Sequence, residues 1–254
     1  MQGGSLSLAG KVAIVTGGSR GIGRAVVDLL SSLGAAVVVN YLRDEEAAAA
    51  AVARAREHGV EAVAIQADVA RLDEADRVVN ETLERFARID LLICNAGIWK
   101  GAPIESITEE LWDQTFDINL KGTWGVCRAA VPVMKRQKSG RIVIVSSTAG
   151  QRGEATYSNY AASKGGQISF MKSLSAELGP FGINVNCVAP GWVDTDMTSE
   201  TLADKSRIDS ILKEIPKGRV ATPEDIAGSV AFLCSAWADH ITGTTISVNG
   251  GSVL

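Results

Sequence analysis

Short apolar runs recur along the chain and are separated by longer stretches of mixed polarity. The runs are continuously apolar, as in KVAIVT at residues 11–16, and do not alternate with polar residues. A continuous run is typical of a strand in a parallel sheet that is covered on both faces. The pattern predicts strands at residues 11–16, 36–41, 60–66, 89–94, 141–146, 183–188 and 245–248.

The stretches between these runs have helical periodicity. After the first run, apolar residues at positions 22, 26, 29, 30 and 33 share one face of a helix. Further helices are predicted at residues 44–58, 72–88, 108–136, 158–179 and 222–236. Strands that alternate with helices predict an α/β fold, a doubly wound parallel sheet of about seven strands with helices on both faces.

One stretch interrupts this alternation. Residues 194–216 are polar and helix-prone and contain no strand-like run, so we predict that they form a small lid insertion. No linker, internal repeat or low-complexity tract divides the chain. We therefore expect residues 1–254 to form a single domain.

The composition argues against several classes of partner. The chain is 46% hydrophobic and has a formal net charge of -4, which gives no electrostatic reason to bind nucleic acid or an anionic membrane. The N-terminus lacks a basic stretch followed by an apolar core, and no apolar stretch reaches the length of a membrane span. We expect a cytoplasmic protein.

The cysteines and histidines give no sign of a metal site. The two histidines are isolated, and the cysteines form no CxxC pair. Each cysteine has apolar neighbours, so buried reduced thiols are expected at Cys94, Cys127, Cys187 and Cys234.

A glycine-rich loop, TGGSRGIG at residues 16–23, follows the first predicted strand and opens the first helix. Glycines let the backbone approach a pyrophosphate closely, and a helix N-terminus offers it unpaired N–H groups. Such a loop can also serve packing alone. Its position within repeating βαβ units favours a Rossmann-type, dinucleotide-binding and catalytic domain, with cofactor contacts from Gly17, Ser19, Arg20, Gly21 and Ile22.

The choice of nucleotide depends on the end of the second strand, where a carboxylate would bind an unmodified adenosine ribose. That strand ends with Asn40 and Tyr41, which carry no charge, while Arg20 and Arg43 could both meet a 2′-phosphate. We therefore expect NADP(H), with NAD(H) as the second choice. The alternative is that both arginines are solvated surface charges and that Asp44 offsets Arg43.

Tyr160 and Lys164 lie four residues apart in a predicted helix, and this spacing places them on one helix face. A free phenol has a pKa near ~10. A nearby ammonium would lower the pKa of Tyr160 and make it a proton donor and acceptor for carbonyl and alcohol chemistry. Taken alone, the pair could equally be a coincidence on a solvated helix face.

With these features, the chain resembles the short-chain dehydrogenase/reductase family over nearly its whole length. TGGSRGIG, NAG at residues 95–97, Ser147 thirteen residues before Tyr160, YAASK and PGWVDT at residues 190–195 stand in the order and spacing of that family. SNYAASKGG, INVNCVAPGWVDTDM and ITGTTISVNGG make it most similar to the 3-oxoacyl-[acyl-carrier-protein] reductases of fatty acid biosynthesis.

The resemblance implies catalytic roles for Asn119, Ser147, Tyr160 and Lys164. In a reduction, Tyr160 would give a proton to the carbonyl oxygen, and Ser147 would hydrogen-bond the same oxygen. Lys164 would hold the nicotinamide ribose and lower the pKa of Tyr160, and Asn119 would hold a water that connects Lys164 to solvent. Each also has a structural alternative, such as Asn119 satisfying local backbone groups.

The resemblance also implies further contacts. The remaining cofactor contacts would come from Asp68, Val69, Asn95, Ala96, Gly97, Pro190, Gly191, Val193 and Thr195. Two of these residues have a structural alternative, since Asp68 could be a helix cap and Thr195 a plain N-cap. The substrate pocket would be formed by Trp99, Ser147, Gln151, Tyr157 and Trp192, although the tryptophans could also serve core packing or a subunit contact.

The implied partners are an acyl-thioester or other small-molecule substrate, an acyl carrier protein, and further copies of the chain in a homotetramer. Lys138 could contact an acidic carrier, but Phe181 stands where such reductases often have an arginine. A dehydrogenase of another alcohol, sugar or ketone is therefore an alternative. A non-catalytic NADP-binding sensor is an alternative of another class, against which the four retained catalytic residues argue.

Overall fold

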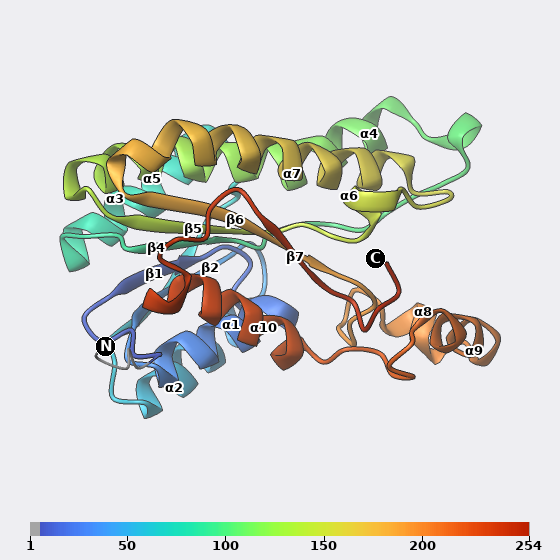
Figure 1. The fold of residues 1–254 in the computed structure, drawn as a ribbon, viewed down its shortest axis with the longest axis horizontal. Helices are drawn as coiled ribbons and strands as arrows, with labels where there is room; N and C mark the ends of the chain where they lie inside the picture. The colour runs from blue at the N-terminus through green and yellow to red at the C-terminus, as the bar shows by residue number, and fades with distance from the viewer. Residues whose placement is uncertain (1–5, 254) are drawn as a thin grey trace.

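The apolar runs form one parallel sheet in the computed structural model, which describes residues 6–253. The seven strands are arranged in the order β3-β2-β1-β4-β5-β6-β7 (Figure 1), which confirms the predicted fold class. The strands are β1 Val12–Val15, β2 Ala36–Tyr41, β3 Ala62–Gln66, β4 Leu91–Cys94, β5 Gly140–Val145, β6 Ile183–Pro190 and β7 Thr245–Val248.

Helices cover both faces of this sheet (Figure 1). On one face, α1, α2 and α10 pack on a cluster that includes Val15, Val39 and Ile93. On the other face, α3, α5 and α7 pack on a cluster that includes Ile14 and Leu92. The α-helices are α1 Gly21–Ser32, α2 Glu45–Glu57, α3 Leu72–Phe86, α4 Glu109–Phe116, α5 Gly122–Gln137, α6 Ala149–Arg152, α7 Ser158–Leu178, α8 Ser199–Ala203, α9 Lys205–Glu214 and α10 Pro223–Cys234.

The strand order reverses at β1, and this reversal positions the site. β1 pairs with β2 on one side, where Val12 lies opposite Ala36, and with β4 on the other, where Ala13 lies opposite Leu91. The connections from β1 and β4 leave the sheet on opposite sides, so the carboxyl ends of these strands open a crevice. Ligands of open α/β sheets bind at such a switch point.

The insertion after β6 forms two short helices, α8 and α9, beyond the carboxyl end of the strand (Figure 1). One isolated parallel bridge, between Val193 and Ala221, closes its base. The predicted lid therefore has helices and no strand of its own among residues 194–216.

Three details differ from the sequence prediction. The helix predicted at residues 108–136 is continuous but changes to π-helical hydrogen bonding at Asp117–Lys121. β6 extends two residues further, to Pro190, because its last residues pair with β7. The short helix α6 lies in a segment expected to be a loop.

All four cysteines are buried free thiols, as predicted. No helix among residues 6–253 combines the length and the apolar character needed to cross a bilayer.

Helix α10 begins with a capping box that is reinforced by an arginine. The Thr222 Oγ1 accepts the Asp225 N–H at 3.3 Å, and the Asp225 Oδ2 accepts the Thr222 N–H at 2.8 Å. Arg219 donates to both carboxylate oxygens of Asp225, at 2.5 and 2.9 Å. Arg219 and the Thr222 N–H hold the pKa of Asp225 well below its usual value.

We expect Asp225→Asn to lower the free energy of unfolding by about 1 kcal/mol at pH 7. A carboxyl pKa that is depressed by folding stabilises the protein above its unfolded pKa near ~4, and this contribution is lost as the pH falls through the folded pKa. Urea unfolding at pH 7 and pH 3 should therefore show a difference that shrinks at the lower pH. Asp209→Asn, at an exposed carboxylate of α9, should have little effect at either pH. An equal loss at both pH values for Asp225→Asn would contradict this assignment.

Candidate active site

Helix α7 brings Tyr160 and Lys164 to the carboxyl end of β5. Both side chains are buried, with 9% and 4% of their surfaces exposed. The Lys164 Nζ donates to the Val145 carbonyl at 2.8 Å, and the Ser146 hydroxyl donates to the Lys164 carbonyl at 2.9 Å. The Lys164 Nζ lies 5.8 Å from the centroid of the Tyr160 ring. The predicted pair therefore shares one helix face, which is anchored to the last residues of β5.

The direction of the Tyr160 pKa shift is the opposite of the sequence prediction. Burial raises the pKa of Tyr160 to about 12, against an opposing hydrogen bond with Ser147, and the charge of Glu154 raises it further. Burial also lowers the pKa of Lys164 to about 8. The prediction was wrong because it counted the attraction of an ammonium and neglected the lost hydration of a phenolate. At neutral pH, Tyr160 is a protonated phenol and can donate a proton.

Ser147 lies two residues after the end of β5, and its hydroxyl is near enough to Tyr160 to lower the pKa of that residue. Its Oγ also accepts the Ala149 N–H at 3.1 Å, at the start of α6. The two hydroxyl groups that the sequence predicts to act on one oxygen are therefore neighbours.

The π-helical turn places Asn119 against the loop that follows β4. The Asn119 Oδ1 accepts the Ile98 N–H at 2.8 Å, and its Nδ2 donates to the Ile98 carbonyl at 3.1 Å and to the Ser163 hydroxyl at 3.0 Å. A Cβ placed on Gly97 would lie 3.1 Å from the Asn119 Oδ1 and 3.6 Å from the Lys164 Nζ. Asn119 thus satisfies backbone groups, and its Oδ1 and the Lys164 Nζ both lie next to Gly97.

The glycine loop is shaped by close backbone contacts. Gly17 has a φ of +61°, a conformation that favours glycine. A Cβ on Gly23 would lie 2.1 Å from the Gly17 carbonyl oxygen and 2.6 Å from the Asn95 Nδ2. Ser19 is buried in this loop, and Ile22 is half-buried. The loop therefore has the close-packed backbone that its glycines predict.

The N-terminus of α1 is free of protein anions. Its N-cap, Arg20, makes no side-chain capping hydrogen bond, and no acidic residue stands in the first turn. The helices α2, α4 and α10 instead have capping side chains and acidic first turns, whereas α7, like α1, has neither. Unpaired N–H groups with no competing carboxylate fit the pyrophosphate of a dinucleotide.

Asn95 and Ala96 tie the end of β4 to the glycine loop. Their N–H groups donate to the Thr16 hydroxyl at 2.9 and 3.0 Å. The Asn95 Nδ2 donates to the carbonyls of Thr16 and Gly17 at 3.0 and 3.1 Å. These residues line the crevice, and the Asn95 side chain itself holds the loop.

Asn40 and Tyr41, at the end of β2, are both buried. The Asn40 Oδ1 accepts the Gly17 N–H at 3.4 Å, and its Nδ2 donates to the carbonyls of Ile65 and Ala67 at 3.3 and 3.1 Å. Asn40 therefore positions the glycine loop between β2 and β3.

The two predicted phosphate-binding arginines are exposed. Arg20 makes only a long ion pair with Asp196 in the lid segment, at 4.0 Å. No ion pair of Arg43 is found among residues 6–253. The neighbouring Asp44 caps α2 by accepting the Ala47 N–H at 2.9 Å. Both guanidinium groups thus remain accessible to an anionic ligand.

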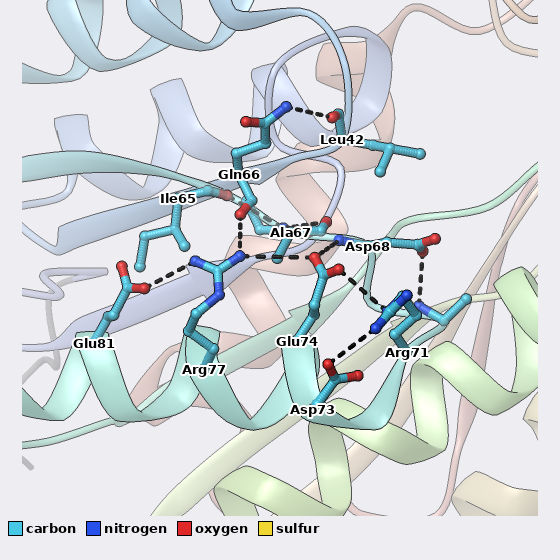
Figure 2. Close-up of polar contacts among 12 residues, drawn as sticks. Leu42, Ile65, Gln66, Ala67, Asp68, Arg71, Asp73, Glu74, Arg77 and Glu81 are labelled. Carbon is cyan, nitrogen blue, oxygen red and sulfur yellow. Dashed lines mark hydrogen bonds and ion pairs between the residues drawn. The ribbon is translucent and has the colours of Figure 1, made fainter.

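Asp68 and Val69 follow β3 in a turn that α3 holds in place (Figure 2). The Asp68 N–H donates to the Glu74 carboxylate at 2.7 Å, and the Asp68 Oδ1 accepts the Ala70 N–H at 3.0 Å. Arg77 donates to the Gln66 carbonyl at 2.5 Å. The turn is fixed before any ligand binds. Asp68 does not cap α3, because the N-cap is Arg71 and the Asp68 Oδ1 accepts the N–H of Ala70 in the turn before the helix.

The segment after β6 reaches the glycine loop. Pro190 and Val193 are buried, and Gly191 is so close to Asn249 that a Cβ would lie 2.9 Å from the Asn249 Cβ. A Cβ on Gly21 would lie 3.4 Å from the Thr195 Cγ2. The glycine loop and the segment after β6, which are both predicted to contact the cofactor, are therefore next to each other at Gly21 and Thr195.

Three of the predicted substrate-pocket residues form an aromatic group. Trp99 stacks on Tyr157 with ring centroids 4.6 Å apart, and Trp192 meets Trp99 edge-on at 5.6 Å. Gln151 is not part of this group, because its side chain hydrogen-bonds the Ser247 hydroxyl of β7 at 3.0 Å.

One further residue of the pocket is absent from the sequence prediction. Glu154 accepts the Trp99 Nε1–H on both carboxylate oxygens, each at 3.3 Å. Its charge raises the pKa values of Tyr157 and Tyr160. A single glutamate in a loop of mixed composition gives no signal in the sequence, and its role depends on the fold that brings Trp99 to it.

Comparison with known proteins identifies full-length relatives. Residues 17–252 match a family model described as Enoyl-(Acyl carrier protein) reductase. A 3-oxoacyl-[acyl-carrier-protein] reductase of Synechocystis sp. is 43% identical over 249 residues, which cover 98% of this chain and 99% of that protein. A reductase of the same name from Staphylococcus aureus is 43% identical over 244 residues, which cover 96% and 98%.

Solved structures of related sequence share the fold over nearly the whole chain. A dehydrogenase/reductase from Sinorhizobium meliloti 1021 has a TM-score of 0.92 and 36% identity, with 98% of both chains covered. Levodione reductase has a TM-score of 0.92 and 32% identity, with 96% of this chain and 97% of that chain covered.

Proposed function

The chain belongs to the short-chain dehydrogenase/reductase family, and from this membership we propose that it reduces the 3-oxo group of an acyl thioester with NADPH. It is an oxidoreductase that uses a nicotinamide cofactor. The observation that carries the proposal is the buried group of Tyr160, Lys164 and the neighbouring Ser147 at the carboxyl end of β5, where Tyr160 is a protonated phenol at neutral pH. A protonated phenol next to a second hydroxyl suits the reduction of a carbonyl, whose oxygen must gain a proton.

The cofactor, when bound, supplies a hydride to the carbonyl carbon. The glycine loop and the uncapped N-terminus of α1 would hold its pyrophosphate, because backbone N–H groups are free there and close approach is possible. Asp68 and Val69 would meet the adenine, and Thr195 lies beside Gly21 at the other end of the crevice. Lys164 would hold the nicotinamide ribose.

The side chains of the site would then divide the work on the substrate. Ser147 would orient the carbonyl oxygen, and Tyr160 would donate the proton to it. Lys164, whose pKa is lowered to about 8, remains mostly protonated at neutral pH and stabilises the negative charge that forms on Tyr160. Asn119, whose Oδ1 lies next to Gly97 as the Lys164 Nζ does, would hold a water through which Tyr160 regains its proton.

We propose that Arg20 and Arg43 select NADPH over NADH. Replacing Arg43 with glutamine should lower kcat/KM for NADPH about tenfold, because one charge-assisted hydrogen bond to the 2′-phosphate is lost. The value for NADH should stay unchanged, since NADH lacks that phosphate. Arg136→Gln, at an exposed arginine on α5, is the matched control. Equal losses with both cofactors would contradict the assignment.

The proposal includes an acyl carrier protein as the partner that carries the natural substrate. A Cβ on Gly182 would lie 2.7 Å from the Lys138 carbonyl, so the backbone of Lys138 lies against the residue that follows Phe181. Phe181 is 40% exposed, and the Lys135 Nζ lies 4.6 Å from its ring centroid and pairs with Glu177 at 3.1 Å. The exposed Lys138 would therefore supply the positive charge for an acidic carrier, although no arginine stands at position 181.

Further copies of the chain are also proposed as partners. A groove of about 380 Å³ lies between α4, α5 and α7 and is lined mainly by Phe116, Leu120, Trp124 and Phe170. Trp124 is 40% exposed. An exposed aromatic groove of this kind favours association into the homotetramer.

The substrate proposal is tested by the initial rate of NADPH oxidation with a short 3-oxoacyl thioester of N-acetylcysteamine, compared with cyclic ketones and the carbonyl forms of sugars. A panel of alcohols is assayed in the reverse direction, by the reduction of NADP+. We expect the thioester to be the fastest substrate. A cyclic ketone that is reduced much faster would assign the aromatic group of Trp99, Tyr157 and Trp192 to ring binding and would overturn the thioester assignment.

A further inference from the structure

A carboxylate, that of Glu154, lies against Trp99, a residue of the predicted substrate pocket. Among residues 6–253, no lysine, arginine or histidine lies within ion-pair distance of Glu154. Burial raises the pKa of Glu154, whereas the Trp99 N–H and the charge of Arg152 lower it. The ion pair of Arg152 is with Glu214, at 3.9 Å. The Trp99 Nε1–H is bound by both Glu154 oxygens at equal distances of 3.3 Å. The ordinary pKa of a glutamate, near ~4.3, lies well below neutral pH, and we take Glu154 to be ionised.

This carboxylate is fixed in place. The Trp99 ring that binds it is stacked on Tyr157 and meets Trp192 edge-on. A Cβ on Gly101 would lie 2.3 Å from the Thr156 carbonyl oxygen and 2.4 Å from Tyr157, so the two loops are in tight contact. Glu154 is half-buried, so it cannot turn away into solvent without losing its only hydrogen-bond donor.

Glu154 lies close to the start of α7, because its partner Trp99 stacks on Tyr157, the N-cap of that helix, and Tyr160 lies in the first turn. Its electrostatic effect on the Tyr160 hydroxyl is part of the reason why the pKa of that group is high. A substrate carbonyl bound to Tyr160 therefore lies within the same field. In a free 3-oxo acid, a carboxylate stands two carbons from that carbonyl, whereas a thioester or an amide at the same position is neutral.

We propose that Glu154 is a specificity-determining residue that rejects substrates with a negative charge close to the reacting carbonyl. A 3-oxoacyl group is then accepted as its neutral thioester and rejected as the free carboxylate. This inference rests on the proposed function and adds to it the charge class of the substrate. The uncharged rings of Trp99, Tyr157 and Trp192 cannot discriminate against a negative charge in this way.

The test compares kcat/KM for the 3-oxobutanoyl thioester of N-acetylcysteamine with kcat/KM for 3-oxobutanoate, in wild type and in Glu154→Gln. Glutamine keeps an acceptor for the Trp99 N–H and removes the charge. We expect the variant to shift the ratio about tenfold toward the free acid, the size expected for two like charges in a partly screened site. Glu200→Gln removes an exposed charge that also acts on Tyr157, and it should leave the ratio unchanged.

A purely structural role of Glu154 would lower both values together and leave their ratio at the wild-type value, and that result would overturn the proposal. A second measurement does not depend on turnover. The dissociation constants of 3-oxobutanamide and 3-oxobutanoate, read from the fluorescence of Trp99 and Trp192, should show the same shift in Glu154→Gln. If wild type does not reduce the thioester, the proposed function fails, while an unchanged ratio of dissociation constants would overturn the role of Glu154.

Discussion

Replacing Tyr160 with phenylalanine is expected to lower kcat about a thousandfold while leaving NADPH binding nearly unchanged. The phenylalanine ring keeps the packing of a side chain that is 9% exposed and removes only the hydroxyl. Ser147 can still hydrogen-bond the substrate oxygen, but a serine hydroxyl is a far weaker acid than a phenol and is a poor proton donor. The measurements are single-turnover rates of NADPH oxidation and NADPH affinity from fluorescence.

Tyr157→Phe is the matched control for this prediction. Tyr157 lies three residues earlier and stacks on Trp99, and the variant loses a hydroxyl that has no part in the proposed proton transfer. It should retain most of the wild-type rate. A Tyr160→Phe enzyme with near wild-type turnover would show that another group donates the proton.

Gly23→Ala should reduce NADPH affinity on the order of a hundredfold, because a shift of about 1 Å in a binding loop can have an effect of that size. The added methyl would lie 2.1 Å from the Gly17 carbonyl oxygen and 2.6 Å from the Asn95 Nδ2. Both are parts of the framework that shapes the glycine loop. Overpacking of this kind also destabilises by about 1–3 kcal/mol. The measurements are NADPH titration and urea unfolding.

Gly228→Ala provides the comparison in the same fold. Gly228 lies inside α10, and a Cβ there has no neighbour within 4 Å. Since alanine is the better helix former, we expect a gain of roughly 0.5–1 kcal/mol and no change in NADPH affinity. Equal effects of the two substitutions would refute the steric explanation for Gly23.

The sheet can be predicted from the sequence because each parallel strand is buried on both faces and therefore appears as a continuous apolar run. β2 and β7 have the predicted bounds. The π-helical turn at Asp117–Lys121 could not be predicted, because its hydrogen-bond shift leaves no periodic signal in so few residues. It determines which way Asn119 faces, so the identity of that residue was predictable and its contacts with Ile98 were not.

The chemistry of the candidate site was less predictable than its residues. The spacing of Tyr160 and Lys164 placed them together, yet the pKa of Tyr160 depends on burial, which spacing does not report. Glu154 has no motif, and its meeting with Trp99 joins segments about fifty residues apart. Gln151 was expected in the pocket, but its partner on β7 is Ser247. These outcomes are set by long-range packing.

The most direct test of the proposed reaction compares matched 3-oxobutanoyl and but-2-enoyl thioesters of N-acetylcysteamine, with NADPH as reductant and product masses as the readout. In the 3-oxo substrate, the carbon that is reduced carries the oxygen that Ser147 and Tyr160 would bind. In the enoyl substrate, the only carbonyl oxygen belongs to the thioester, two carbons away. We predict rapid formation of the 3-hydroxybutanoyl thioester and little reduction of the enoyl compound. Faster reduction of the enoyl thioester would contradict the assignment.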